Sequence, residues 1–360
     1  MYKLSSNDIK YYLRPTGYVP QSVGKSLKQK NCSFEVNGNY FTSIEVIKRQ
    51  NKKTIKESFN FSEFLKKIIN KNIHIDLLYK NLLKKNNFLK NNLLSSERKY
   101  LIFGILNVTP DSFSDGGENL ALENATKTTD EMIKMGADYI DVGGESTRPG
   151  AKKVDISDEA IRVLPLIQRL NYKKIKISLD TRNSSTMEFG LLSGVNMIND
   201  VSGLTYDKNS IRIIKKYGVP VILMHMPGNP KTMMKRNKYN NVVLDVYDYL
   251  EKQINFCELN GIKRHNIIID PGIGFGKDYH QNIELINNLS IFHTLNCSIM
   301  LGVSRKRFIS SISDEKNPKM RLGGTISATL NALMQGIRIH RVHDVKQVNQ
   351  AVKVFEKLNS

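Results

Sequence analysis

The stretch LIFGIL at residues 101–106 runs directly into NVTPDSFSDGG at residues 107–117, and this change from apolar to polar residues sets the pattern of the chain. A short run rich in apolar and β-branched residues is typical of a buried strand, and the polar cluster after it is typical of a loop. The same arrangement recurs at seven later runs, which are residues 139–142, 175–179, 195–198, 219–224, 267–269, 299–303 and 337–339.

Each later run also ends at a polar or charged cluster, and these clusters read in order GGESTRPG, DTR, NDVSG, HM, DPGIGFGK, SRK and RVHD. Strands that alternate with helical stretches indicate βα units around a parallel sheet. Eight such units over about 260 residues match the size of a closed (β/α)8 TIM barrel, whose active site lies where the strands end. We therefore expect one mouth to be lined by Asn107, Arg148, Asp180, Asn199, His225, Asp270, Lys306 and His343.

Glycines at regular places support the barrel more strongly than any single strand. The first barrel helix is expected around residues 122–135, and glycine follows it before the next strand. Glycine just past a helix end accepts the left-handed backbone conformation that closes a helix. The same helix–glycine–strand order recurs along the chain, at Gly136, Gly194, Gly218, Gly261 and Gly336.

The first 98 residues differ from the rest in charge. They hold 19 Lys and Arg against 7 Asp and Glu, whereas the remaining chain holds 35 against 27. We interpret residues 1–98 as a small α+β accessory region of unknown role and residues 99–360 as the barrel domain. The accessory region is expected to pack on the closed end of the barrel or at the edge of a dimer interface.

The accessory region shows local order of its own. The pair Asn37-Gly38 tolerates the positive φ values of a two-residue turn, so residues 32–36 and 40–47 are expected to form a β-hairpin. Apolar residues at helical spacing predict a helix over residues 62–83 with Ser62 as its N-cap. The polar residues 84–99 then read as a connector to the barrel.

The whole-chain composition limits the partners and the compartment. A net charge of +20 could attract nucleic acid, but Lys and Asn are enriched throughout and no nucleic-acid motif accompanies the charge, so we do not expect nucleic acid as a partner. The first residues contain no apolar signal segment, and no run approaches membrane-spanning length. The three cysteines are far apart and show no metal-ligand spacing. We expect a cytoplasmic protein without disulfides or membrane contact.

Three cationic groups predict an anion site. Arg341 and His343 lie two residues apart at the last strand, where side chains two apart share a face, and Arg148 follows the second strand. The planar fork of arginine favours phosphate or carboxylate groups, and barrels often bind phosphate near their later strands. The alternative is that these residues are ion-paired at the rim, with Asp344 or Glu145 as partners.

Acceptor side chains follow three of the strands. Asp180, Asn199 and Asp270 end the third, fourth and sixth runs. A carboxylate that leaves an apolar strand is costly to bury unless it meets a donor. Two carboxylates beside an amide suit a flat heterocycle rich in N–H donors, such as a pterin or a purine. The alternative is that they pair with Lys306 or Arg182 inside the mouth.

The remaining motifs are weaker. In DPGIGFGK the glycines let the backbone approach a ligand and Phe275 offers an aromatic face, although the spacing fits neither a P-loop nor a dinucleotide fingerprint. Residues 109–117 and 146–151 have the composition of lids or of ordinary loops.

His225 could be a general base or a structural histidine. No nucleophile elbow or paired metal-binding histidines are present.

Taken in order, these motifs resemble the dihydropteroate synthase family of the folate pathway. The matching strings are NVTPDSFSDGG, DVGGESTRPGA, SLDT, INDVSG, LMHM, DPGIGFGK, GVSRK and RVHDV, and they span residues 100–345. The resemblance does not cover residues 1–98. It implies a transferase that joins 6-hydroxymethyl-7,8-dihydropterin pyrophosphate to para-aminobenzoate, with 7,8-dihydropteroate and pyrophosphate as products. It also implies a homodimer and sulfonamide binding.

The resemblance also implies a role for each matching residue. The catalytic residues would be Arg148, Lys306 and His343, with Arg341 helping to hold the pyrophosphate. Asp180, Asn199 and Asp270 would bind the pterin, Lys306 would serve both substrates, and the aminobenzoate ring would lie against Thr147, Pro149 and Phe275. Asn107 would place a Mg²⁺ ion that bridges the diphosphate oxygens.

Two other functions compete with this reading. A pterin-binding methyltransferase that moves a methyl group from methyltetrahydrofolate to a corrinoid would share the carboxylates and the amide. It would not need Arg148, SRK and RVHD together, because it has no diphosphate to hold. A non-catalytic scaffold barrel would be expected to lose these anion and pterin residues, and all of them are present.

Overall fold

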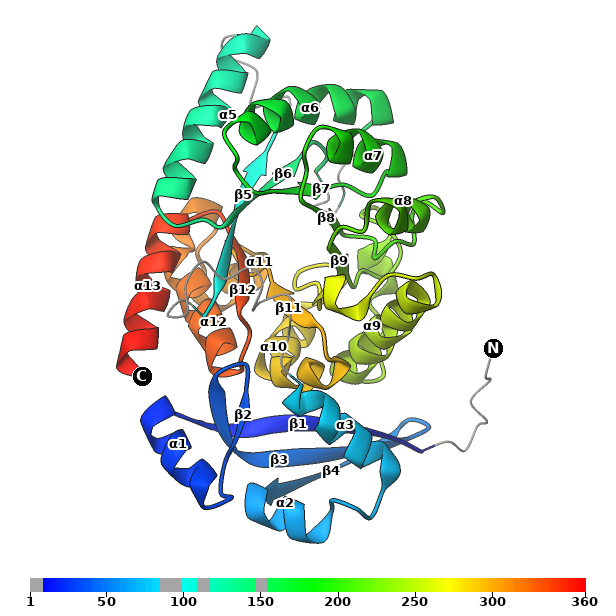
Figure 1. Ribbon diagram of the computed structural model, residues 1–360, viewed down its shortest axis with the longest axis vertical. Coiled ribbons are helices and arrows are strands. Elements are labelled where there is room, and N and C mark those ends of the chain that lie inside the picture. Colours follow the sequence, from blue (N-terminus) through cyan, green and yellow to red (C-terminus); the bar gives the residue numbers. More distant parts are fainter. Residues whose placement is uncertain (1–8, 85–98, 109–116, 147–149, 151–153) are drawn as a thin grey trace.

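The structure, a computed structural model, describes residues 9–84, 99–108, 117–146, 150 and 154–360, and Figure 1 shows two units within them. A barrel begins at Leu101, and a smaller unit with its own sheet precedes it. Most of the predicted connector lies at residues 85–98, outside the described residues. Most of the two predicted lid or loop segments also lies outside them, at residues 109–116, 147–149 and 151–153.

Within the described residues, eight parallel strands close into the barrel, as the sequence predicts. Each strand pairs with its neighbour in sequence, and the last strand pairs with the first at Ile339 and Leu101. The strands are β5 (Leu101–Asn107), β6 (Tyr139–Gly143), β7 (Ile177–Asp180), β8 (Met197–Asp200), β9 (Val221–Met224), β10 (Ile267–Asp270), β11 (Ser298–Leu301) and β12 (Ile339–Val342).

Helices surround these strands, as Figure 1 shows. The glycines predicted to end helices all have positive φ, for example 102° at Gly136 and 64° at Gly218, which confirms their role. The first helix begins at Gly117, earlier than predicted. The helices are α5 (Gly117–Lys134), α6 (Ile156–Tyr172), α7 (Ser184–Leu192), α8 (Ser210–Tyr217), α9 (Val242–Leu259), α10 (Tyr279–Asn287), α11 (Arg307–Ser313), α12 (Leu322–Met334) and α13 (Val345–Leu358).

The inside of the barrel is filled at its amino end. Buried apolar side chains from alternating strand positions pack together there, and the Phe103 and Tyr139 rings stack with centroids 4.6 Å apart. The cluster consists of Leu101, Phe103, Tyr139, Met197, Ile222, Ile268, Met300 and Ile339. This apolar layer closes the barrel below the polar residues and forms the floor of the mouth.

The small unit is an antiparallel sheet with three helices, and we call it the N-terminal module. Its central strand β3 (Asn39–Gln50) pairs with β1 (Ile9–Val19), β2 (Phe34–Val36) and β4 (Lys53–Asn60). The helices are α1 (Gln21–Gln29), α2 (Phe61–Lys67) and α3 (Ile73–Leu83). Buried residues such as Phe34, Phe41 and Phe64 give the module its own core.

The predictions for this module were partly right. The register pairs Val36 with Asn39, so Asn37 and Gly38 form the predicted two-residue turn, with φ of 49° and 82°. The single helix predicted over residues 62–83 was wrong, because the chain breaks at Asn70, where φ is 66°. Its predicted N-cap was also wrong, since Asn60 and not Ser62 accepts the capping hydrogen bond, from the Glu63 amide.

The module packs against the amino, closed end of the barrel, opposite the mouth. Strand β1 contacts the 3₁₀ segment η4 (Leu289–Leu295), which leads into the start of β11. Ser290 Oγ donates to the Pro15 carbonyl at 2.8 Å, and the Gln21 amide donates to the Asn359 carbonyl at 2.9 Å. Of the two alternatives predicted for the module, the structure shows packing on the closed end, and a place at a dimer interface stays a prediction.

The basic charge of the module is partly used in this contact. Lys10 Nζ lies 2.6 Å from Asp248 and 2.5 Å from Glu251, both on α9. Arg49 lies 2.8 Å from Asp245 on the same helix. The basic strands of the module therefore meet an acidic face of the barrel, and part of the unusual charge has an internal partner.

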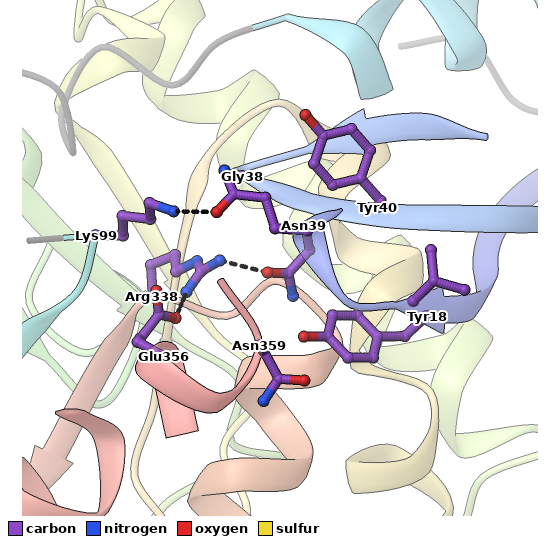
Figure 2. Close-up of a pocket in the computed structure, with 10 residues that line it drawn as sticks. Tyr18, Gly38, Asn39, Tyr40, Lys99, Arg338, Glu356 and Asn359 are labelled. Carbon is purple, nitrogen blue, oxygen red and sulfur yellow. Dashed lines mark hydrogen bonds and ion pairs between the residues drawn. The ribbon is translucent and has the colours of Figure 1, made fainter. Parts of the chain in front are cut away.

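A small cavity of about 10 Å³, room for about one water molecule, lies in this contact (Figure 2). Arg338, which is 2% exposed, lies there 2.5 Å from Glu356 and also donates to Asn39 and to the Asn37 carbonyl. The cavity is too small for a substrate, and Arg338, Glu356 and Asn39 in its lining are already paired with one another. In the described residues no helix combines the length and the apolarity that crossing a membrane requires.

Candidate active site at the barrel mouth

A polar layer lies directly above the apolar floor, and strand geometry explains it. Side chains two residues apart on a strand point to the same face. Four floor residues are each followed two positions later by a polar residue that therefore points into the barrel. The pairs are Tyr139 and Asp141, Met197 and Asn199, Ile268 and Asp270, and Ile339 and Arg341.

Arg341 lies at the centre of this layer and joins two carboxylates. Its Nε donates to Asp141 Oδ2 at 2.6 Å, and its Nη2 donates to Asp180 Oδ2 at 2.9 Å. Asn199 Nδ2 donates to both oxygens of Asp141, at 3.2 and 3.3 Å. Arg341, Asp141, Asp180 and Asn199 therefore form one connected network across four strands.

Asp180 retains an acceptor within this network. Its Oδ1 is enclosed and accepts no hydrogen bond from the described residues. Burial raises the pKa of Asp180 to about 8, and Arg341 opposes this shift while Asp141, Glu159 and Asp200 add to it. An enclosed carboxylate with an open acceptor gains strongly from a ligand that brings N–H donors.

Asp270 and Lys306 form the neighbouring part of the mouth. Asp270 Oδ1 accepts from the Gly272 amide at 2.7 Å, and burial raises the pKa of this carboxyl while Lys306 opposes the shift. Lys306 donates to the Ile273 carbonyl. Burial and the nearby Arg341 lower the pKa of Lys306 to about 8, against the attraction of Asp270. The pKa of this lysine therefore lies closer to neutral pH than that of an ordinary lysine.

The loop after β10 brings Phe275 to Lys306. The Lys306 Nζ lies 4.6 Å from the centroid of the Phe275 ring. Phe275 is half-buried and packs on a cluster that includes Met224 and Met226. The loop turns at glycines with positive φ, and a Cβ at Gly272 would lie 2.0 Å from the His225 carbonyl oxygen. The backbone therefore requires glycine at this close approach.

Of the other predicted site residues, the structure describes Asn107 and His343 but not the residues of the second loop. Asn107 ends β5 with an exposed side chain, beside Gly143 in the register. His343 lies one residue beyond β12, and its Nδ1 is 3.0 Å from Ser304 Oγ. Arg341 and His343 consequently contact different neighbours. Three residues assigned to the second loop lie outside the described residues, and these are Thr147, Arg148 and Pro149.

Arg341 and Asp180 form other ion pairs among the described residues than the alternatives considered for them. Arg148 lies outside these residues, and Asp270 does have Lys306 as a charged neighbour. Asp344 pairs with Arg305 at 2.5 Å, and Glu145 pairs with Arg182 at 2.8 Å. Asp344 and Glu145 are therefore not the partners of Arg341. Asp180 has Arg341 as its partner instead of Lys306 or Arg182.

His225 has a structural position. It is 5% exposed, its Nδ1 lies 2.9 Å from Lys277 Nζ, and its ring packs edge-on against Tyr249 with centroids 4.7 Å apart. Burial and the nearby Lys277 hold the pKa of His225 well below its usual value. These contacts favour the structural alternative for His225 over the general-base one.

Two residues of the site were missed by sequence reasoning. Asp141 lies within a strand and not at its end, and its spacing of two residues from the apolar Tyr139 is the signal that could have identified it. The motif DPGIGFGK predicts a glycine-rich loop and indicates no separate role for Lys277. Its buried Nζ donates to the Gly272 and Phe275 carbonyls at 2.9 and 3.0 Å, which ties that loop together.

The described residues include no group of three or more His, Cys, Asp or Glu side chains arranged to hold a metal. Asn107 offers one amide oxygen at the rim. Mg²⁺ is usually bound by one or two protein oxygens together with substrate phosphates and water. The single oxygen that Asn107 offers is compatible with a magnesium ion shared with substrate phosphates.

Comparison with known proteins gives a consistent result for the barrel. Residues 103–343 match the family model described as pterin binding enzyme. The dihydropteroate synthase of Escherichia coli strain K12 is 42% identical over 256 residues, which cover 71% of this chain and 90% of that protein. The match begins after the N-terminal module.

Solved structures give the same result. The dihydropteroate synthase of Xanthomonas albilineans with 4-aminobenzoic acid has a TM-score of 0.70 and 36% identity, and covers 76% of this chain and 97% of that chain. The same enzyme with 7,8-dihydropteroate has a TM-score of 0.67, 34% identity and coverage of 76% and 98%. The Yersinia pestis enzyme with a sulfonamide drug has a TM-score of 0.69, 36% identity and coverage of 74% and 96%.

Proposed function

The chain belongs to the pterin-binding enzymes, and among them to the dihydropteroate synthase family, and from this premise we propose how its residues divide the work. Enzymes of this family are transferases that join 6-hydroxymethyl-7,8-dihydropterin pyrophosphate to para-aminobenzoate and release pyrophosphate. The observation that carries our proposal is the open acceptor Asp180 Oδ1, enclosed directly above the apolar floor.

The pterin would bind in the polar layer. Its amino-pyrimidine edge carries several N–H donors, and the layer offers acceptors on Asp180, Asn199 and Asp270. Gly143 and Gly302 line this layer without a side chain, and a Cβ at Gly302 would lie at ordinary contact distance, 3.9 Å from Arg341 and 4.0 Å from Asp270. A flat ring could therefore lie across the layer with its donor edge toward the carboxylates.

The diphosphate would lie toward the rim. His343 and Arg148 follow the last and the second strand, and Arg341 Nη1 makes no hydrogen bond with the described residues. Arginine and histidine donors in a partly dry site stabilise an anion that gains charge as its bond breaks. Asn107 would hold a Mg²⁺ ion, which when bound neutralises charge on the diphosphate oxygens.

The aminobenzoate would lie between the loops. Lys306 supplies a cation for the carboxylate and Phe275 a ring face, and Thr147 and Pro149 would close the other side. The amine of aminobenzoate is neutral at pH 7, so it needs no strong base. We propose that the carbon–oxygen bond to the diphosphate breaks ahead of amine attack, with the pterin ring delocalising positive charge, while the barrel holds both reactants in place.

Pyrophosphate release tests this function. Full-length protein is given the dihydropterin pyrophosphate and Mg²⁺, with and without para-aminobenzoate. Release that depends on aminobenzoate and falls by roughly 30- to 150-fold in Arg148→Ala supports the proposal, since one charge-assisted contact is worth about 2–3 kcal/mol. Absence of release, together with methyl transfer from methyltetrahydrofolate to a corrinoid, would favour the methyltransferase alternative.

Two further properties of the family are proposed for this chain. One is a homodimer, which light scattering of the purified protein would distinguish from a monomer.

The other is competition by a sulfonamide with para-aminobenzoate, since the Yersinia pestis enzyme was solved with such a drug. A sulfonamide that raises the KM for aminobenzoate without changing kcat would support binding at Phe275 and Lys306.

A further inference from the structure

We propose that Asp141 is a positioning residue for the pterin. It orients the Asn199 amide so that the carbonyl oxygen, and not the NH2 group, meets the ligand, and it keeps Arg341 from binding Asp180 Oδ1. This inference rests on the proposed function and extends it to a residue given no role above. Asp141 contacts no substrate in this scheme, and it acts through its two neighbours.

The position of Asp141 is central. It lies on β6 between β5 and β7, paired with Ile105 on one side and Ser178 on the other. Its side chain is 0% exposed, so its charge must be balanced by the protein. Both oxygens accept from Asn199 Nδ2, and Oδ2 also accepts from Arg341 Nε at 2.6 Å.

The first consequence concerns the amide of Asn199. A carboxylate can only accept hydrogen bonds, so the Asn199 atom that faces Asp141 must be the NH2 group. The carbonyl oxygen of Asn199 is then turned away from Asp141, and it accepts no hydrogen bond from the described residues. A flipped amide would place two acceptors against each other, at a cost of about 1–3 kcal/mol. Asp141 therefore makes Asn199 an acceptor toward the pterin.

The second consequence concerns Arg341. A guanidinium beside one carboxylate favours a bidentate pair that uses both oxygens. Here Arg341 is divided, with Nε on Asp141 and Nη2 on Asp180, so it reaches only Oδ2 of Asp180. Asp180 Oδ1 therefore remains without a partner among the residues that the structure describes. Without the negative charge of Asp141, Arg341 is free to turn onto both oxygens of Asp180 and remove the acceptor that the pterin needs.

The substitution Asp141→Asn tests both consequences with little change in shape. The introduced amide can still accept from Arg341 through its oxygen, but its NH2 group would face Asn199 and favour the flipped amide there. Asn199 would then present a donor to the donor edge of the pterin. We expect the dissociation constant for 7,8-dihydropteroate to rise about 10- to 100-fold, since one or two hydrogen bonds are lost. The KM for para-aminobenzoate should change less than about twofold, because that site lies at Lys306 and Phe275.

Asp138→Asn is the matched control. Asp138 is also a buried carboxylate, placed just before β6 at its closed end, where it accepts from the Ile102 amide at 2.7 Å. The same chemical change there affects stability without touching the mouth. Its affinity for 7,8-dihydropteroate should match the wild type.

The double substitution Asp141→Asn with Asn199→Asp provides the rescue. The amide at position 141 then donates to the carboxylate at position 199, which again presents an oxygen to the pterin. We expect this exchange to recover at least half of the lost binding free energy. A purely structural role for Asp141 predicts no recovery, because two substitutions in a buried network would add their costs.

Three results would overturn the proposal: unchanged pterin affinity in Asp141→Asn, an equal loss in Asp138→Asn, or an exchange variant that binds no better than Asp141→Asn. If Asp141→Asn does not fold, the exchange variant is compared directly with wild type, and failure of both to fold makes Asp141 structural and also overturns it. Failure of the proposed function is seen separately, because wild-type protein would then bind no 7,8-dihydropteroate at all.

Discussion

The barrel mouth and the contact between the N-terminal module and the barrel are both networks of buried or half-buried charges, and they differ in how completely those charges are used. At the module contact, Arg338 meets Glu356, Asn39 and the Asn37 carbonyl, and Lys10 meets two carboxylates. In the mouth, Asp180 retains an open oxygen and the pKa of Lys306 is lowered to about 8.

This difference separates a structural network from a ligand site. Buried polar groups are normally satisfied, so an enclosed acceptor without a donor calls for an explanation. Other buried atoms, such as Glu159 Oε1 and the His340 ring nitrogens, also have no partner among the described residues, so it is the position of Asp180 Oδ1 in the polar layer of the mouth that points to a ligand. Stability and activity should therefore respond in opposite ways to changes in the two regions. Substitutions in the mouth should reduce turnover and spare the fold, whereas substitutions at the module contact should do the reverse.

Asp180→Asn should give the largest effect on activity. It removes the carboxylate that faces the pterin donors, and kcat/KM should fall about 100-fold, equivalent to about 2.7 kcal/mol. Because the pKa of Asp180 is higher in the folded protein than in the unfolded chain, this carboxyl stabilises the ligand-free fold fully only at a pH below its unfolded pKa. That contribution is lost as the pH rises toward 8. The amide removes this cost, so the melting temperature at pH 8 should be equal to or above that of wild type.

Steady-state kinetics and thermal melting at pH 8 check this prediction together. A variant with low activity and a clearly lower melting temperature would place Asp180 among the structural residues. It would also remove the distinction between the two regions that the open oxygen suggests.

Arg338→Ala should give the converse result at the module contact. The substitution leaves the Glu356 carboxylate, which is 22% exposed, without its partner, and strips the donors from Asn39. Breaking such a pair costs several kcal/mol when fully buried, and partial exposure of Glu356 reduces this to about 2 kcal/mol. Denaturant unfolding should show the loss, while kcat/KM of the folded protein should stay within about twofold of wild type. A large loss of turnover would mean that the module influences the mouth.

The sequence predicted the barrel well because its signals are local and repeated. Each strand is a short apolar run with a polar stop, and each glycine after a helix takes the backbone angle that only glycine adopts easily. Strands β1 and β4 escaped detection because their residues do not form apolar runs: the sequence of β4, KTIKESFN, is mostly exposed in the structure. The helix break at Asn70 was also hidden, since apolar spacing continues across it.

The site residues that lie at strand ends were predicted from the sequence. Contacts that depend on the three-dimensional arrangement of the strands were not. Asp180, Asn199 and Asp270 lie together in the mouth, as expected. Their connection through Arg341 and Asp141 was not foreseen, because it depends on which strands face each other across the barrel. The enclosure of His225 between Lys277 and Tyr249 is likewise invisible in LMHM.

The pH dependence of aminobenzoate binding should give a smaller effect in the mouth. The pKa of Lys306 is lowered to about 8, so the lysine loses its proton as pH rises through 8. An anion that depends on this cation binds more weakly above that pH. The KM for para-aminobenzoate should therefore rise about tenfold between pH 7 and pH 9, since the charged fraction falls from about 90% to about 10%.

Lys306→Arg is the control for this titration, because arginine keeps its charge over this range. Its KM for para-aminobenzoate should be nearly flat from pH 7 to pH 9, whatever its absolute value. A wild-type KM that is equally flat would show that Lys306 does not hold the aminobenzoate carboxylate.

Lys10→Met should give the smallest effect, and it tests how much the basic charge of the module contributes to docking. Lys10 pairs with Asp248 and Glu251, but all three side chains are 30–36% exposed, so solvent screens the attraction. The loss of stability should be at most about 1 kcal/mol in low salt and should shrink at 1 M salt, where the Debye length falls to about 3 Å. Lys28→Met, which removes a more exposed pair with Glu35 inside the module, should change nothing measurable. A large loss that does not depend on salt would mean that Lys10 contributes through the packing of its stem on Tyr12 and Tyr247, not through its charge.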